Sequence, residues 1–204
     1  MYIAFAGTKG GSGKSVLSLH VAYWLSRKSK TALIDADIIK SATHWSERGG
    51  GALGVPIFSE KQAPRIAAQF EHLVFDCPGR ASREELKDLA QACDWLICPA
   101  FVDAMNIDAA LSLGAMLAEL KIENYRIVLN RAPQTNPPRA AIEARELLEQ
   151  AGIPMLKTIV RDSAAFKHAG FAGLTVDRLP AHVAASSGAA WDDITNLAKE
   201  ISRL

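Results

Sequence analysis

The chain has 204 residues, of which 49% are apolar and 22% are charged. This balance fits one soluble globular domain with a sizeable core, and it excludes collagen-like, disordered and coiled-coil architectures. Lysine and arginine total 23 against 22 aspartate and glutamate, which leaves a formal net charge of +1. A constitutive tight binder of polyanions needs many uncompensated cations, so the overall charge disfavours that class.

Short apolar segments rich in β-branched or aromatic residues alternate with longer segments of helical periodicity. The expected strands are Tyr2–Ala6, Thr31–Ile34, Leu73–Phe75, Trp95–Cys98, Arg126–Leu129 and Met155–Val160. The expected helices are Lys14–Arg27, Arg83–Ala92, Ile107–Leu120, Arg139–Ala151 and Ala189–Arg203. Continuously apolar strands are typical of a parallel sheet buried on both faces. The pattern predicts an α/β fold: one domain over residues 1–204, with a mostly parallel, twisted sheet and helices on both faces.

The remaining segments suggest short loops and a cytoplasmic protein. Residues 49–51, 133–138 and 184–188 are interpreted as loops, because none separates two composition regimes. The three cysteines have no zinc-type spacing, which indicates reduced and mostly buried thiols. The N-terminal apolar stretch lacks a basic region before it, and no apolar run approaches the roughly 20 residues of a membrane span. We therefore expect no signal peptide and no membrane anchor.

The first expected strand runs into a segment rich in glycine and lysine, and a helical pattern follows at once. Residues 7–15 read Gly-Thr-Lys-Gly-Gly-Ser-Gly-Lys-Ser. Glycines allow backbone amides to curl around a phosphate, and the helix N-terminus adds its positive end. We expect Lys14 to contact the β and γ phosphates and the Ser15 hydroxyl to ligate Mg²⁺. The alternative is a glycine-rich turn with incidental lysines, which the flanking strand and helix make improbable.

This segment departs from the strict P-loop pattern, because Thr8 stands where a glycine is expected. It resembles the deviant Walker A motif of the ParA/MinD family of ATPases, and the resemblance extends over the whole chain. It is closest to the small ParA-type partition ATPases that lack an N-terminal DNA-binding domain. The resemblance implies that Lys9 and Lys14 both act in catalysis. Lys9 would cross a dimer interface and contact the ATP bound in the other subunit. The alternative is that Lys9 is a solvated loop lysine. It also implies a nucleotide-binding segment made of Lys9, Gly10, Gly11, Ser12, Gly13, Lys14 and Ser15.

Two acidic segments resemble other motifs of the family. Residues 33–37, Leu-Ile-Asp-Ala-Asp, look like switch I, which implies that Asp37 orients or activates the attacking water and belongs to the metal site. Residues 73–76, Leu-Val-Phe-Asp, look like Walker B, which implies that Asp76 holds Mg²⁺. Carboxylates at the C-terminal ends of parallel strands lie beside the ligand crevice. The chain departs from the family pattern at Ile38-Ile39, where Pro-Gln is frequent, and at Gly79, where many members have a proline.

Two later segments resemble the base-binding parts of the family. Residues 127–131, Ile-Val-Leu-Asn-Arg, look like its adenine strand, which implies that Asn130 and Arg131 contact the nucleotide. A side-chain amide can both donate to and accept from the exocyclic edge of adenine, although a capping or turn role for Asn130 is the alternative. Residues 157–166 resemble the segment that closes over the base, which implies nucleotide contacts from Arg161 and Asp162.

The resemblance implies a complete ATPase cycle. ATP with Mg²⁺ would drive homodimerisation, the dimer would bind DNA without sequence preference at the nucleoid, and a ParB-like or other adaptor protein would stimulate slow hydrolysis. Such a cycle partitions or positions a cargo, either plasmid or chromosomal DNA or a large protein assembly such as a carboxysome. Charge is uneven, with seven cations and three anions in residues 1–50 but five and ten in residues 51–120. The candidate DNA contacts are Lys157, Arg161, Lys167 and Arg178. The alternative is that these cations form an ordinary solvated surface.

Other functions remain as alternatives. A MinD-like membrane cycle needs a basic amphipathic final helix, whereas here the face opposite the apolar stripe sums to −1, with Asp192, Asp193 and Glu200 against Lys199 and Arg203. We therefore expect that helix to pack on the sheet. An ATP-dependent metabolic enzyme needs a second substrate pocket, and an iron-sulfur reductase needs available cysteines. A non-enzymatic ATP-dependent scaffold differs from an ATPase in showing no turnover.

Overall fold

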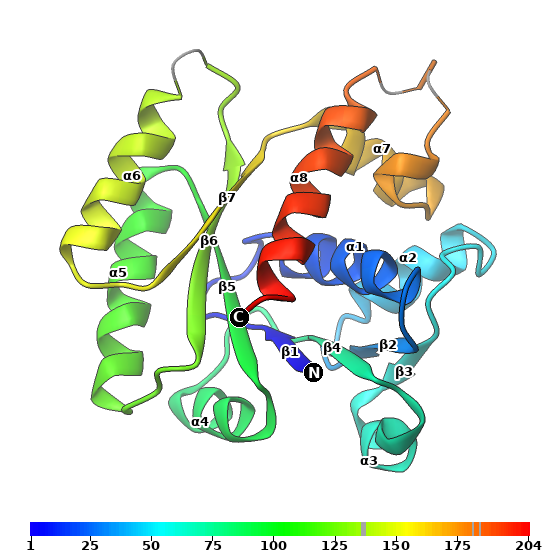
Figure 1. Ribbon diagram of the computed structural model, residues 1–204, viewed down its shortest axis with the longest axis horizontal. Helices are drawn as coiled ribbons and strands as arrows, with labels where there is room; N and C mark the ends of the chain where they lie inside the picture. The colour runs from blue at the N-terminus through cyan, green and yellow to red at the C-terminus, as the bar shows by residue number, and fades with distance from the viewer. Residues whose placement is uncertain (136–137, 181, 184) are drawn as a thin grey trace.

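The computed structural model describes residues 1–135, 138–180, 182–183 and 185–204. Its centre is one sheet in which every described strand pair is parallel (Figure 1). The strands are β1 (Tyr2–Phe5), β2 (Thr31–Asp35), β3 (Ile57–Ser59), β4 (His72–Asp76), β5 (Trp95–Phe101), β6 (Tyr125–Ala132) and β7 (Met155–Arg161). Their order across the sheet is β3-β2-β4-β1-β5-β6-β7. The predicted α/β fold with a parallel sheet is confirmed.

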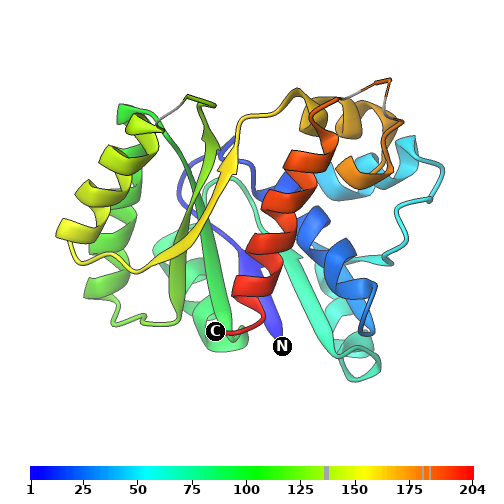
Figure 2. The same cartoon turned by 45° about the horizontal axis from the view of Figure 1, so that its top comes forward.

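Helices cover both faces of the sheet. They are α1 (Lys14–Ser26), α2 (Ser41–Arg48), α3 (Ala63–Ile66), α4 (Arg83–Ala92), α5 (Ala104–Glu119), α6 (Arg139–Gln150), α7 (Ala164–Ala172) and α8 (Ser187–Ile201). One core cluster joins the sheet to α1, α2, α7 and α8, and a second joins it to α4, α5 and α6. Figure 2 shows α5 and α6 on one flank and α1, α7 and α8 on the other.

The predicted elements are all present, with shifted ends and four additions. Strand β5 extends to Phe101 and strand β6 to Ala132, whereas the final helix begins at Ser187 and ends at Ile201. The sequence prediction missed β3, α2, α3 and α7, which are short. The loop at 49–51 is confirmed; of the other two expected loops, residues 136–137 and 184 lie outside the described part of the chain.

Two smaller predictions are also confirmed. Cys77, Cys93 and Cys98 are free thiols, and all three are buried. The final helix packs on the protein, because its apolar side chains Ile194, Leu197 and Ile201 are fully buried. Among the described residues, no helix has the length and apolar character needed to cross a bilayer.

Helix α8 also contacts the outer strand β7 through two carboxylates. Glu200 accepts hydrogen bonds from the backbone N–H groups of Lys157 and Thr158, at 2.6 and 2.9 Å. Asp193 accepts one from the backbone N–H of Arg161 at 3.0 Å. Asp193 is buried, so the sequence prediction that placed it on the exposed polar face of the helix is wrong.

The strand register brings the candidate acidic residues together. In a parallel sheet the carboxyl ends of neighbouring strands meet at one edge, where ligands bind. Asp76 at the end of β4 pairs with Phe5 at the end of β1 and with Asp35 at the end of β2. The chain leaves β1 at this edge and enters α1 at Lys14. The segment between them therefore lies beside both carboxylates.

Candidate nucleotide site

The segment between β1 and α1 has the backbone shape of a phosphate-binding loop. Gly11 and Gly13 have φ values of 76° and 93°, a left-handed region that other residues seldom adopt. Gly13 is also the N-cap of α1, and a Cβ atom on it would lie 2.2 Å from the Asn130 amide nitrogen. Only glycine fits at residue 13. The loop therefore presents its amides and the N-terminus of α1 at the carboxyl edge of the sheet.

Lys14 is a buried cation whose partners are neutral. Its side chain is 5% exposed, and its amine donates to the Lys9 carbonyl oxygen at 2.9 Å and to the Ser12 hydroxyl at 3.5 Å. Burial lowers the pKa of Lys14, and the carboxylate of Asp76 opposes this shift. A buried ammonium without an anionic partner is costly, and a phosphate on the loop would supply that partner.

Asp76 is the buried anion of the same site. Both of its carboxylate oxygens are buried and accept no hydrogen bond from the described residues. Burial raises its pKa from 3.8 to about 7; the carboxylates of Asp35 and Asp37 add to the rise, whereas Ser15 and Lys14 oppose it. An orphaned carboxylate beside a hydroxyl is a suitable environment for a hard cation such as Mg²⁺.

The described residues contain no cluster of three or more His, Cys, Asp or Glu side chains able to hold a metal. Mg²⁺ usually binds through one or two protein ligands together with substrate phosphates and water. Ser15 and Asp76 therefore fit such an ion, provided that a phosphate completes its ligand set.

Switch I is divided between an anchoring and an available carboxylate. Asp35 is fully buried and accepts hydrogen bonds from the Thr43 backbone N–H at 2.9 Å and from its hydroxyl at 2.6 Å, which ties β2 to α2. Asp37 is half-buried, and one oxygen accepts a hydrogen bond from the Ile39 N–H at 3.0 Å. Within the described chain its other oxygen accepts none. Asp37 therefore has an oxygen available for a water molecule or a metal ion, and its catalytic role stays a prediction.

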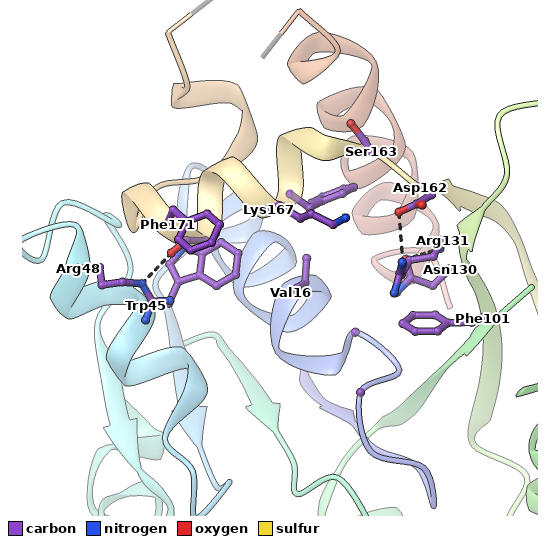
Figure 3. A pocket seen from close by; sticks show the side chains of 14 residues that line it. Val16, Trp45, Arg48, Phe101, Asn130, Arg131, Asp162, Ser163, Lys167 and Phe171 are labelled. Carbon is purple, nitrogen blue, oxygen red and sulfur yellow. Dashed lines mark hydrogen bonds and ion pairs between the residues drawn. The ribbon is translucent and has the colours of Figure 1, made fainter. Parts of the chain in front are cut away.

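Three of the four predicted base-binding residues, Asn130, Arg131 and Asp162, lie at one end of a cavity. Asn130 donates to the Ser12 carbonyl oxygen at 3.0 Å and accepts from the Arg131 backbone N–H at 2.9 Å. The Arg131 guanidinium lies over the Phe101 ring, 4.8 Å from its centroid, and pairs with Asp162 at 3.3 Å. Figure 3 shows these side chains together. With Gly11 and Gly13 they line a cavity of about 630 Å³, a size typical of small-molecule sites.

Arg161 does not line this cavity. Its guanidinium binds Asp193 of α8 through two hydrogen bonds of 2.7 and 2.8 Å, and this pairing raises the pKa of Arg161 further. A bidentate ion pair of this kind holds the side chain against α8. The structure therefore separates Arg161 from Asn130, Arg131 and Asp162, with which the sequence had grouped it.

The four candidate DNA contacts lie on three different elements. Lys157 and Arg161 belong to β7, Lys167 to α7, and Arg178 to the 3₁₀ turn at 176–178. The Arg178 guanidinium donates to the Ala52 carbonyl oxygen, so, like Arg161, it already has an intramolecular partner. Lys157 and Lys167 are exposed, and Lys167 also lines the cavity. DNA contact by these residues stays a prediction.

The other end of the cavity is built by residues that, apart from Phe166 at the end of segment 157–166, the sequence motifs do not indicate. Val16, Trp45, Arg48, Phe166, Gly170 and Phe171 line it, from α1, α2 and α7. Their signal in the sequence is weak, because α2 and α7 are short and have no extended apolar stripe.

Helices α2 and α7 are joined by specific contacts. The Trp45 indole donates to the Leu174 carbonyl oxygen at 3.0 Å, and the Arg48 guanidinium donates to that of Gly170 at 2.7 Å. The backbones of Gly49 and Gly173 touch, since a Cβ atom on either would lie about 2 Å from the other. The two helices therefore behave as one packed unit beside switch I.

A parallel sheet with a P-loop after its first strand and buried aspartates after its second and fourth strands defines the P-loop nucleotide-binding class. Residues 3–176 match the family model described as the CobQ/CobB/MinD/ParA nucleotide binding domain. The chain belongs to this family.

Two curated relatives share the name "Maintenance of carboxysome distribution protein A". The protein from Gloeobacter kilaueensis is 28% identical over 182 residues, which cover 85% of this chain and 82% of the relative. The protein from Halothiobacillus neapolitanus is 27% identical over an alignment of 212 positions, which covers 98% of this chain and 95% of the relative.

Solved structures share the fold at low sequence identity. MinD from Aquifex aeolicus superimposes with a TM-score of 0.74 at 15% identity, over 100% of this chain and 97% of MinD. A McdA variant from Cyanothece in complex with ATP superimposes with a TM-score of 0.72 at 10% identity, over 98% of this chain and 96% of the variant. A ParA family ATPase from Chlorobium tepidum gives 0.72 at 16% identity, over 98% of each chain. The predicted relation to ParA and MinD proteins is confirmed.

Proposed function

We propose that this protein is a ParA-type ATPase that hydrolyses ATP to ADP and phosphate in order to position a cargo. One observation carries the proposal: the amine of Lys14 and the carboxylate of Asp76 are both buried at the P-loop, close enough for their charges to interact but without a direct ion pair. Buried charges without partners are expensive, and they are typical of sites that a ligand completes. Mg²⁺ and a triphosphate supply both missing partners.

Little covalent chemistry is required of the protein in this reaction, because phosphoryl transfer is catalysed by positioning and charge stabilisation. The P-loop amides and the α1 N-terminus hold the phosphates, and Lys14 stabilises the negative charge that develops on them. The free oxygen of Asp37 accepts a hydrogen bond from the attacking water and aligns it. Ser15 and Asp76 would hold a bound Mg²⁺, which would supply positive charge next to the phosphates. Asp35 maintains switch I by fixing β2 to α2.

The proposed function includes an ATP-dependent homodimer in which Lys9 reaches the nucleotide of the partner subunit. The Lys9 side chain is half-buried and makes no hydrogen bond or ion pair within the residues that the structure describes. Its carbonyl oxygen, by contrast, receives the amine of Lys14. The Lys9 amine is therefore available for a contact outside its own subunit.

Lys9→Ala should abolish ATP-dependent dimerisation while leaving ATP affinity within about fivefold, because the Lys14 amine and the loop amides remain. Sedimentation velocity with and without Mg-ATP measures the dimer, and calorimetry measures the affinity. Lys121→Ala, an exposed lysine after α5, is the matched control and should dimerise normally. A normal ATP-dependent dimer in Lys9→Ala would show that the lysine does not cross the interface.

We further propose that the ATP-bound dimer binds DNA without sequence preference and that an adaptor protein stimulates hydrolysis. The two curated relatives are named for carboxysome distribution, which supports a large protein assembly as the cargo in preference to a plasmid. The net charge of +1 makes a single copy a weak polyanion binder. Pairing two copies doubles any cationic surface, so nucleotide can control DNA affinity.

A mobility-shift titration with non-specific duplex DNA tests this cycle. We expect binding with Mg-ATP only, and little with ADP or without nucleotide. Binding should also weaken steeply with salt, roughly tenfold or more between 50 and 200 mM, because phosphate contacts release counterions. Equal DNA affinity in the three nucleotide states would contradict the proposed cycle, whereas it would leave ATP hydrolysis unaffected.

A further inference from the structure

The cavity beside the P-loop has an apolar half that the nucleotide motifs do not explain. It is lined by rings from α2 and α7 and by the first turn of α1, and Figure 3 shows Trp45, Val16 and Phe171 on this side, away from Asn130 and Phe101. Val16 directly follows Ser15, so the apolar lining begins one residue beyond the phosphate-binding segment. Gly11 and Gly13 border the same cavity. A ligand whose phosphates lie on the P-loop has room to extend along this lining.

Two of the rings are fixed by a buried histidine. His20 makes edge-to-face contacts with Trp45 and Phe166, with ring centroids 5.8 and 5.4 Å apart. Its Nε2 accepts a hydrogen bond from the Val176 N–H at 3.2 Å, so the proton is on Nδ1, which donates to the Val16 carbonyl oxygen at 2.7 Å. Burial lowers the pKa of His20 to about 4, and the ring is neutral at pH 7. Trp45 and Phe166 therefore form a preformed surface.

Phe171 differs from these two rings, because it is 83% exposed at the rim of the cavity. Large aromatic side chains bury much apolar area when they pack, so such exposure beside an apolar cavity marks a contact that a ligand completes. The neighbouring ring of Trp45 is only 7% exposed. Phe171 can thus lose water on ligand binding, whereas Trp45 is already largely shielded.

We propose that Trp45, Phe166 and Phe171 form an aromatic wall that contacts the base of the bound nucleotide, and that Phe171 supplies affinity for the base independently of the phosphates. This inference rests on the nucleotide site proposed above. Aromatic rings stack on any base, since every base has a π face. The wall therefore provides affinity through contact with the face of the base. A purine gains more contact area on the wall than a pyrimidine does.

Phe171→Ala tests the wall with two ligands that differ only in the nucleoside. Affinities for ATP and for inorganic tripolyphosphate, both with Mg²⁺, are measured by calorimetry. We expect ATP to bind roughly tenfold more weakly, as is typical for the loss of a base-stacking ring, and tripolyphosphate to bind as before. Phe171→Trp should restore ATP affinity. Leu147→Ala, an exposed residue of α6 outside the cavity, is the control and should change neither affinity.

A second measurement compares ATP with CTP. The unmodified protein should prefer ATP, and Phe171→Ala should narrow that preference. Unchanged ATP affinity in Phe171→Ala, or an equal loss for ATP and tripolyphosphate, would overturn the aromatic wall while leaving the P-loop site intact. Failure of the unmodified protein to bind either ligand would instead overturn the nucleotide site, and the wall with it.

Discussion

Lys14→Ala should abolish ATP binding. The amine lies within the P-loop, where its present partners are the Lys9 carbonyl oxygen and the Ser12 hydroxyl. Its removal leaves the buried carboxylate of Asp76 to repel a triphosphate without compensation. In the complex with ATP, Lys14 would form a buried charge pair with the phosphates. Truncating one partner of such a pair costs about 3 kcal/mol or more, which corresponds to a loss of affinity above roughly 100-fold. Calorimetry with Mg-ATP measures this loss.

Lys87→Ala provides the matched control, because Lys87 is an exposed lysine of α4. This variant should bind ATP normally. Thermal unfolding without nucleotide should show that Lys14→Ala remains folded, since the substitution removes a buried charge that has only neutral hydrogen-bond partners. Retained ATP affinity in a folded Lys14→Ala protein would contradict the P-loop assignment.

Asp37→Ala should stop ATP turnover while preserving ATP binding. The side chain follows β2, and its free oxygen is the group expected to align the attacking water. Groups that position or activate a nucleophile contribute about 100-fold or more to the rate, so kcat should fall by at least that factor. Affinity for ATP should change little, because Lys14 and the loop amides are intact. Phosphate release measures turnover, and calorimetry measures binding.

The matched control for this second substitution is Asp88→Ala, which changes an exposed aspartate of α4. Its turnover should equal that of the unmodified protein. ATP-dependent dimers should also persist in Asp37→Ala, since the proposed dimerisation requires bound ATP and not its hydrolysis. Hydrolysis at the normal rate in Asp37→Ala would refute the water-positioning role.

The sequence predicted the P-loop edge of the fold well because its determinants are local. Residue 13 must be glycine, because a Cβ atom there would collide with Asn130. The short, mainly apolar segments at β2 and β4 are typical of buried strands. The C-terminal end of a parallel strand then fixes where Asp35 and Asp76 lie. These features depend on the residues themselves and on sheet topology, both of which the sequence carries.

Other features depend on contacts between distant segments. Helix α7 buries only Ala165 and Ala169, a pattern that is too weak to distinguish it from a loop. Arg161 and Asp193 are 32 residues apart, and nothing in either local sequence indicates that they pair. The aromatic wall arises only when α2 and α7 pack together, so no spacing of Trp45, Phe166 and Phe171 could have revealed it.

The two carboxylates of α8 also limit how this protein associates with other chains. An outer strand with free N–H groups invites a strand from another molecule to pair with it, which leads to aggregation. On β7 three such groups are occupied by Glu200 and Asp193, and the opposite outer strand, β3, is only three residues long. Both sheet edges are thus poor templates. Association of this protein through another of its faces would therefore not lead to polymerisation through the sheet edges.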